Sequence, residues 1–563
     1  MRKSKIIALC LFAGSLCLGA CSPAVEDRNS VKMAEGTETA KEAGEKDDRI
    51  QKEETRENGQ ETDASQGVEM SREAEDRYPL SLITSPDGNY IWGEEKPLCH
   101  TSYARLWLDT REETSSRTGA LAFPELAAAL EEMNNRTKGN MEESIKELES
   151  QAREMRANDS SSELFKEEEL WVVRGDSEML SILRRESSYE GGAHGQYIYT
   201  GITLDSKSGK EMELGEIVTN PGELVELAAD RLAKKYPDAQ FFESPKEVML
   251  KELNEGSLSW VVGYDGLTFY FSPYELAPYA SGVLTVTILY EEKPELFVSR
   301  VRQVPQAWAV RLAPGMEYDL GYDKTLDTVE VWMDSEEVGD AYTGLFVSVN
   351  GQERSQKDLW FYQYTPYVVR SNDLNTELLV VETVSDNDYK ITMVCGLNPE
   401  EEGFGVFNQL ESTGFSDYWR EKEDGTFESG TEIFANPKHF SLMTRMNLLS
   451  TYNGVRWYGL CEEAKEEGYL KPEQPWYEVD RGNNPLTLLV SLDMEVGEGG
   501  NVETFPEGTK LWIVRTDGDY VEFVTEDDRT CRVYMESAEW PGWIKGVADK
   551  DITEIFGGMM FAG

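Results

Sequence analysis

The stretch GLTFYFSPYELAPYASGVLTVTILY, residues 266–290, decides how the central part of this 563-residue chain folds. Its two ends, 267–272 and 283–290, are apolar runs rich in β-branched and aromatic residues, and such runs are typical of strands. The loop between them, 272–282, contains two prolines, two tyrosines and one glutamate. The pattern therefore predicts two buried strands joined by a stiff loop.

Helices and further strands are expected around this stretch. Because proline favours the first turn of a helix, one helix is expected to begin at Pro124 and another at Pro221. Spacings of three and four residues predict an apolar stripe on a charged helix, formed by Met141, Ile145, Leu148, Ala152 and Met155. Strands are expected at 197–204 and 259–262. Together these elements predict an α+β domain over residues 78–297, with an antiparallel sheet backed by packed helices.

Strand patterns dominate after residue 297. Apolar runs at 377–384 and 389–395 flank Ser385-Asp386-Asn387-Asp388, a composition typical of a hairpin turn. Runs at 511–514, 520–524 and 531–535 predict a meander, and the glycines around residue 498 mark a boundary. We expect a β-rich domain at 298–496 and a small β-barrel-like domain at 497–563. The latter resembles bacterial SH3-like modules in strand number and length.

The N-terminus carries a targeting signal. A basic start is followed by the apolar run 6–18, which is too short to span a bilayer and has the proportions of a secretory signal. The run ends in Leu18-Gly19-Ala20-Cys21, which resembles the bacterial lipobox. We expect residues 1–20 to be a lipoprotein signal peptide and Cys21 to be lipidated, which would anchor the protein on the extracytoplasmic face of the cell membrane. The alternative is an ordinary signal peptide with a chance cysteine.

Residues 22–77 contain no Phe, Tyr or Trp, and positions 26–77 hold 17 acidic and 9 basic residues. Such a segment cannot bury enough apolar surface to offset its ordering entropy. Residues 21–77 are therefore expected to be a disordered charged tether.

The overall charge limits the classes of partner. Lys and Arg total 55 and Asp and Glu total 106, which gives a formal net charge of −51. This balance excludes nucleic acid, whose phosphates require clustered basic residues, and electrostatic docking on anionic lipid. It suits a basic protein, because opposite fields steer encounter.

Motifs of enzymes and metal sites are missing from the sequence. It contains no HExxH, GxSxG, phosphate loop or GxGxxG, and its histidines are His100, His194 and His439. We therefore expect neither an enzyme nor a metal or other cofactor. Four cysteines beyond Cys21 lack CxxC spacing, so zinc is not expected, while disulfides and buried free thiols both stay open: Cys99, Cys395, Cys461 and Cys531.

Two segments carry a resemblance to a known family. One is YEGGAH (189–194), which leads through the strand at 197–204 into DSKSGK (205–210), and the other is 266–282. Together they resemble the extracellular domain shared by RsiV-type lysozyme-sensing anti-sigma factors and by the N-terminal region of certain peptidoglycan deacetylases. The resemblance covers about 80–297.

The resemblance implies a binding function, because in the sensor branch this domain binds lysozyme and exposes a proteolysis site. It implies a contact surface on the loop 272–282, with His194 as a neighbour: Tyr274, Glu275, Pro278, Tyr279 and His194. The chain departs from both branches, because it has a lipobox in place of a sigma-binding segment with a transmembrane helix, and it lacks the deacetylase domain. The residues themselves also allow a structural interpretation, in which both tyrosines cap the core edge and the two glycines before His194 form a turn with positive φ.

Two functional classes stay open. The first is a surface binding or sensing lipoprotein that captures lysozyme or another basic protein active on the cell wall. The second is a lipoprotein that binds cell-wall glycan or acts as a scaffold through aromatic residues of the β-rich part. Its stacking candidates are Trp360, Phe361, Tyr362, Trp457, Trp476, Trp540 and Trp543.

Overall fold

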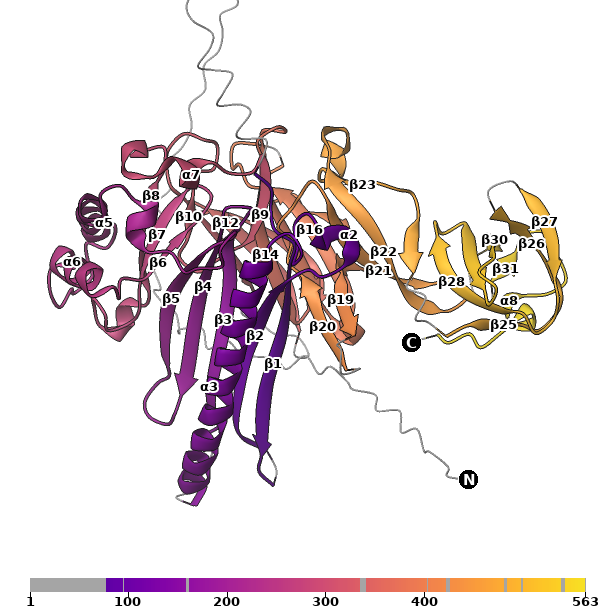
Figure 1. The fold of residues 1–563 in the computed structure, drawn as a ribbon, viewed down its shortest axis with the longest axis horizontal. Coiled ribbons are helices and arrows are strands. Elements are labelled where there is room, and N and C mark those ends of the chain that lie inside the picture. The colour runs from indigo at the N-terminus through magenta and orange to yellow at the C-terminus, as the bar shows by residue number, and fades with distance from the viewer. Residues whose placement is uncertain are drawn as a thin grey trace, which may run out of the picture. The chain divides into compact units, whose positions relative to one another are not determined.

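The computed structural model describes residues 77–561, apart from 95, 158–161, 335–340, 402, 422–425, 480–483, 498–499 and 538–541 (Figure 1). The expected signal peptide, Cys21 and the tether up to residue 76 lie outside the described residues. Within the described ranges, none of the helices combines the length and apolarity that a membrane span requires.

The prediction of an α+β domain with packed helices is wrong. The structure is mostly β, with 47% strand and 19% helix distributed over several sheets. Seven strands form the first sheet, in the order β19-β20-β1-β2-β3-β4-β5. They are β1 (Leu82–Trp92), β2 (Pro97–Leu108), β3 (Leu164–Gly175), β4 (Met179–Tyr189), β5 (Gln196–Asp205), β19 (Asp417–Glu421) and β20 (Phe427–Glu432).

The charge on these strands explains the error. β3 begins LFKEEEL and β4 ends RRESSY, so neither segment reads as an apolar run. The structure accommodates these charges by pairing them across the two strands, as Arg185 with Glu169 at 2.8 Å and Arg184 with Glu168 at 3.8 Å. The sheet is also not wholly antiparallel, since β2 and β3 pair in parallel.

The helix α3 (Pro124–Ala157) makes the crossover between these two parallel strands. It begins at Pro124 as predicted, and it buries the stripe that the spacing indicated, including Met141, Ile145 and Leu148. Asn134 fastens α3 to β2, because its side chain accepts from the Leu106 amide at 3.0 Å and donates to the Leu106 carbonyl at 2.8 Å.

A three-stranded sheet confirms the strands expected in the central stretch. It consists of β6 (Trp260–Val262), β7 (Gly266–Phe271) and β8 (Leu284–Leu289), and every residue of β7 and β8 is buried. The helix α5 (Pro221–Lys235) begins at Pro221 as predicted, after Asn220 caps it by accepting from the Glu223 amide. The other α-helices of the described residues are α2 (Glu112–Ser115), α4 (Leu214–Ile217), α6 (Pro245–Glu255), α7 (Ser299–Arg302) and α8 (Ile552–Ile555).

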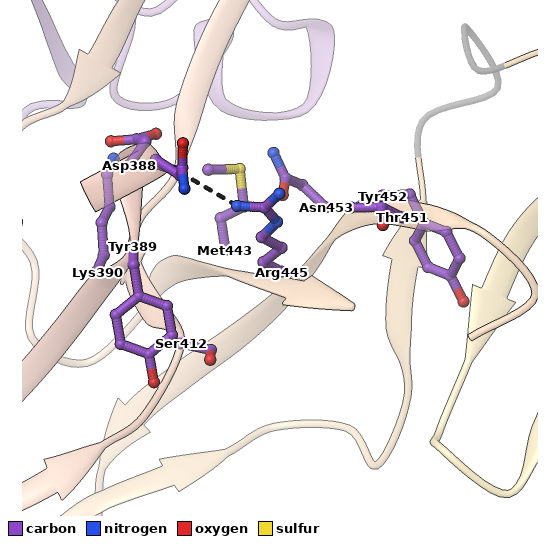
Figure 2. A pocket seen from close by; sticks show the side chains of 10 residues that line it. Asp388, Tyr389, Lys390, Ser412, Met443, Arg445, Thr451, Tyr452 and Asn453 are labelled. Atoms are coloured by element: carbon purple, nitrogen blue, oxygen red, sulfur yellow. Dashed lines mark hydrogen bonds between the residues drawn. The ribbon is translucent and has the colours of Figure 1, made fainter. Parts of the chain in front are cut away.

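Two further sheets follow in the chain, with strand orders β10-β11-β12-β13 and β17-β16-β15-β14-β9. The strands β15 and β16 form the predicted hairpin. In its turn, Asn387 and Asp388 have φ of 55° and 58°. This turn borders a polar cleft (Figure 2). The strands are β9 (Ala307–Arg311), β10 (Glu317–Tyr318), β11 (Asp327–Met333), β12 (Tyr342–Val349), β13 (Gln352–Phe361), β14 (Gln363–Ser371), β15 (Thr376–Val384), β16 (Lys390–Gly396) and β17 (Asn408–Leu410).

The last sheet has 13 strands and includes the predicted meander β28-β29-β30. These strands join β21, β22 and β24 in one sheet, so the described residues after 497 do not form a separate SH3-like sheet. The expected domain boundaries at 297 and 497 stay predictions. The strands are β18 (Thr413–Phe415), β21 (Phe440–Asn447), β22 (Thr451–Leu460), β23 (Leu470–Pro472), β24 (Tyr477–Val479), β25 (Leu486–Leu488), β26 (Leu492–Val496), β27 (Asn501–Phe505), β28 (Lys510–Thr516), β29 (Tyr520–Thr525), β30 (Thr530–Ser537), β31 (Trp543–Ile544) and β32 (Phe556–Gly557).

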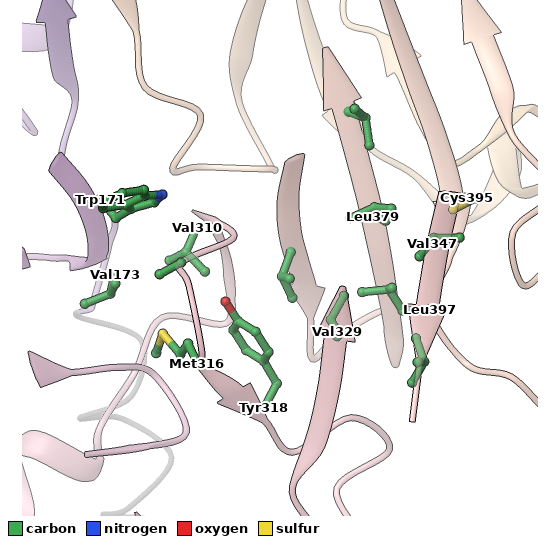
Figure 3. Packing of buried hydrophobic residues seen from close by; sticks show 14 of the residues in the cluster. Trp171, Val173, Val310, Met316, Tyr318, Val329, Val347, Leu379, Cys395 and Leu397 are labelled. Carbon is green, nitrogen blue, oxygen red and sulfur yellow. The ribbon is translucent and has the colours of Figure 1, made fainter. Parts of the chain in front are cut away.

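One of the two largest apolar clusters among the described residues joins the first sheet to the sheets that follow it in sequence. Figure 3 shows Trp171 of β3 together with residues of β9, β12, β15 and β16, among them Val310, Val347 and Leu379. Cys395 lies in the same cluster. The structure contains free thiols, and not disulfides, at all four cysteines for which both possibilities were open: Cys99, Cys395, Cys461 and Cys531.

Candidate functional site

The candidate site lies where the turn between β4 and β5 meets the loop between β7 and β8. Nε2 of His194 lies 3.3 Å from the hydroxyl of Tyr274, although the two residues are 80 positions apart. The His194 ring also stacks on Tyr279, with centroids 4.1 Å apart. Three of the five residues predicted for binding are thus brought together, and we call His194, Tyr274 and Tyr279 the aromatic patch.

Backbone geometry presents the patch to solvent. Gly191 and Gly192 have φ of 89° and 141°, which confirms the predicted turn with positive φ ahead of His194. Tyr274 has φ of 71°, a left-handed conformation that is costly for a bulky residue, and its side chain is 54% exposed. Such strain persists only where the surroundings hold it, and it concentrates at functional positions.

Hydrogen bonds within the loop hold Tyr274 in this conformation. The Tyr274 amide donates to the Ala277 carbonyl at 3.0 Å, and the Glu275 amide donates to the Ser272 carbonyl at 3.1 Å. A carboxylate oxygen of Glu275 in turn accepts from the Ser272 amide at 2.7 Å. Pro278 precedes the short 3-10 helix Tyr279–Ser281 and, as its N-cap, has φ of −56°.

Glu275 and Pro278 therefore shape the loop, whereas the aromatic patch forms its exposed surface. Burial raises the pKa of Glu275 to about 7, against the lowering effect of the Ser272 amide and with a further rise from the neighbouring Glu252 of α6. The carboxyl groups of Glu275 and Glu252 lie close enough for each to change the pKa of the other. Glu275 thus lies where the loop meets α6.

Further tyrosines, which the sequence analysis did not assign to the site, support the patch from below. Tyr197 meets Tyr279 edge to face at 5.9 Å and meets Tyr199 in the same way at 5.9 Å. Tyr199 stacks on Tyr270 at 5.7 Å, and both of these rings are buried. The Y-x-Y spacing at 197–199 was the available signal, because residues two apart on a strand share a face. The patch therefore rests on a column of rings that continues into the core.

The chemistry of the patch is that of a contact surface. Nδ1 of His194 donates to the Gly195 carbonyl at 2.8 Å, which leaves Nε2 of the neutral ring to accept from Tyr274. Among the residues that the structure describes, no group of three or more His, Cys, Asp and Glu side chains is placed to hold a metal ion. The exposed ring of Tyr274 and the half-buried ring of Tyr279 offer large contact area and little conformational entropy to lose.

The stacking candidates of the alternative class lie on several different elements. Trp360 and Tyr362 both donate to the carboxylate of Asp386, at 3.3 and 2.9 Å. Phe361 is buried, Trp457 stacks on His439 at 4.2 Å, and Trp476 lies under Arg515. Trp543 is partly exposed on β31, and Trp540 lies outside the described residues.

The comparisons with known proteins concern the segment that carries most of this site. Residues 219–291 match DUF3298, a protein family of unknown function. The matched segment contains α5, α6 and β6–β8 with the loop of Tyr274 and Tyr279, while His194 lies before it. A search of curated proteins gives no match.

Two solved structures of DUF3298 family proteins are similar to part of this chain. One, from Bacteroides fragilis, is 20% identical, and the similarity covers 40% of this chain and 96% of that chain with a TM-score of 0.29. The other, from Pseudomonas aeruginosa, is 16% identical and covers 41% of this chain and 99% of that chain with a TM-score of 0.27. The family match over residues 219–291 supports the resemblance at the level of DUF3298, and nothing ties the chain to lysozyme sensors or deacetylases specifically.

Proposed function

We propose that this protein is an extracytoplasmic binding protein, anchored by a lipid on Cys21, whose aromatic patch contacts a basic protein active on the cell wall, such as lysozyme. The observation that carries the proposal is the exposed Tyr274, held in a left-handed conformation against His194 and Tyr279. Location and anchoring rest on the apolar run and lipobox-like motif of the N-terminus.

Preorganisation supports binding at this patch. A contact residue that is already ordered loses little side-chain entropy when the complex forms, so more of the contact energy appears as affinity. Tyr279 is stacked on His194 and braced by Tyr197, and the loop is closed by its own hydrogen bonds. Aromatic side chains with such support are frequent hot spots of protein interfaces.

Charge supports the class of partner. A formal charge of −51 attracts a basic protein over distances of about a Debye length and raises the association rate. Binding is therefore expected to weaken as the salt concentration rises, while stacking on the patch provides the contact energy at short range.

The test measures the heat of binding between this protein and lysozyme by calorimetry, at low and at physiological salt. Tyr274→Ala and Tyr279→Ala should each weaken binding by roughly 5- to 150-fold, the range of an interface hot spot of about 1–3 kcal/mol. Tyr534→Ala is the matched control, because this tyrosine is 38% exposed on β30 and does not belong to the patch. Absence of heat at both salt concentrations would contradict the partner, and unchanged affinity in both patch variants would contradict the site.

A further inference from the structure

A polar cleft lies between the turn of the β15–β16 hairpin and the hairpin of β21 and β22 (Figure 2). Its volume is about 310 Å³, which is at the lower end of the range for small-molecule sites. The lining residues come from four segments, and none of them belongs to the aromatic patch. They include Asn387, Asp388, Ser412, Arg445, Thr451 and Asn453.

Contacts around the cleft hold its walls in place. Nη1 of Arg445 donates to the Asn387 carbonyl at 3.2 Å, the bond drawn as a dashed line in Figure 2, and the Arg445 amide donates to the Ser412 carbonyl at 3.2 Å. The turn is braced from its other end by Trp360 and Tyr362, which donate to Asp386. The cleft is thus bounded by elements that hydrogen bonds tie together.

The charges in the cleft nearly cancel. Lys390 is buried, and its ammonium lies 3.6 Å from Asp417. Burial alone would lower the pKa of Lys390, but the nearby carboxylates of Glu382 and Asp417 raise it. Asp388 also acts on Lys390, so the cleft and its immediate surroundings hold two cations, Lys390 and Arg445, and three carboxylates. A polyanion would lack basic partners here, and an apolar ligand would leave buried polar groups without hydrogen bonds.

The remaining side chains provide donors and acceptors in similar number. The amides of Asn387 and Asn453 offer both, the carboxylate of Asp388 accepts, and Arg445 uses for its bond to Asn387 one of the five N–H groups of a guanidinium. The hydroxyl of Ser412 can serve either role, whereas the hydroxyl of Thr451 already donates to Oδ1 of Asn447 at 2.5 Å and offers the cleft an acceptor. A ligand that matches this lining carries many hydroxyl or amide groups and no net charge.

We propose that this cleft binds a neutral oligosaccharide. The proposal does not rest on the function assigned to the aromatic patch, since the two sites share no residue. In this site Asp388 accepts from sugar hydroxyls, while Arg445 and Asn453 donate to ring and carbonyl oxygens. Tyr389 forms a side wall, and its hydroxyl is held by the carboxylate of Glu411 at 2.8 Å.

The experiment titrates the full chain with chitotetraose and with maltotetraose, followed by saturation-transfer NMR and calorimetry. Asp388→Asn is the principal variant, because asparagine tolerates the φ of 58° as readily as aspartate does and the fold is preserved. Asn453→Ala is the second, since this residue is exposed on β22. Asp528→Asn is the matched control: Asp528 also has φ of 58°, in the turn between β29 and β30, and does not line the cleft.

The wild type and the control should bind at least one of these tetrasaccharides, and both cleft variants should bind it about ten-fold more weakly, the effect of losing one hydrogen bond to a charged or well-placed group. Lysozyme binding should be the same in all four proteins, which separates this proposal from the first. Absence of saturable binding up to about 10 mM ligand would overturn the proposal, as would equal affinity in the cleft variants and the control. Preference for an anionic tetragalacturonate over both neutral sugars would overturn the neutral class.

Discussion

Replacing His100 should destabilise the first sheet in a pH-dependent way. His100 lies on β2, is 8% exposed, and has carboxylate oxygens on both sides: Nδ1 is 2.8 Å from Glu163 and Nε2 is 2.9 Å from Glu167. The rings of Tyr90 and Phe165 stack on it at 4.9 and 5.7 Å. A ring with carboxylates at both nitrogens satisfies both contacts only as the imidazolium, because only that form donates from each nitrogen.

The magnitude follows from these contacts. Each hydrogen bond to a charged group contributes about 1.5–3 kcal/mol, and the lower value applies here because the side chains of Glu163 and Glu167 are 38% and 22% exposed. Loss of the stacking on two rings adds about 0.5–1.5 kcal/mol. His100→Ala should therefore lower the free energy of unfolding by about 3.5–4.5 kcal/mol at pH 6.

The pH dependence has a definite sign. Burial alone lowers the pKa of His100, but the hydrogen bonds to Glu167 and Glu163 outweigh burial and raise the pKa above its ordinary value of 6.5. A group whose pKa is higher in the folded state contributes its full stabilisation below the unfolded pKa and loses it as the pH rises through the folded pKa. The difference between wild type and His100→Ala should therefore be largest below about pH 6.5 and should shrink at alkaline pH.

Urea unfolding at pH 5.5, 7 and 9 measures this difference, and hydrogen exchange of the paired backbone at Cys99–Tyr103 locates it on the junction of β2 and β3. His439→Ala is the matched control, because His439 is half exposed and has one carboxylate partner, Glu473, at 2.8 Å. A cost for His100→Ala no larger than that for His439→Ala, or a cost that stays constant across the three pH values, would refute the reasoning.

Two other predictions concern the loop and the anchor. Because the pKa of Glu275 is raised to about 7 while the unfolded value is near 4.5, the wild type should lose stability as the pH rises from about 4.5 to 7. The free energy of unfolding of Glu275→Gln should exceed that of the wild type by about 1–3 kcal/mol at pH 8 and should not exceed it at pH 4. Urea titrations at the two pH values would check this. Cys21→Ala should move the protein from the membrane fraction to the soluble fraction and abolish incorporation of labelled fatty acid; a membrane-bound, labelled variant would disprove the anchor.

Part of the site was accessible from the sequence. The two segments 189–194 and 266–282 indicated that His194 and the loop of Tyr274 and Tyr279 act together, and the structure places these rings in contact. The orientation of Glu275 was not accessible, because it depends on Glu252 of α6, whose position relative to the loop no local pattern reveals. The polar cleft was missed for the same reason, since its lining is gathered from the segments 387–390, 412, 443–445 and 451–453.

By itself, the sequence determined the features that depend on neighbouring residues. Proline and apolar spacing located the starts of α3 and α5, apolar runs located β7 and β8, and Asp-Asn-Asp marked the turn between β15 and β16. These signals act over a few residues, within one helical turn or one hairpin.

The tertiary structure alone decided which strands share a sheet. β1 pairs with β20 across more than 300 positions, β2 pairs in parallel with β3 through the α3 crossover, and Tyr197, Tyr199 and Tyr270 stack beneath the patch. Charged strands such as β3 became part of a sheet because their charges pair across to the neighbouring strand, as Glu169 does with Arg185, while Trp171 and Val173 pack in the core. Local propensity predicts neither the pairing of these strands nor the place of charged strands in the sheet, because both depend on burial against segments far away in the chain.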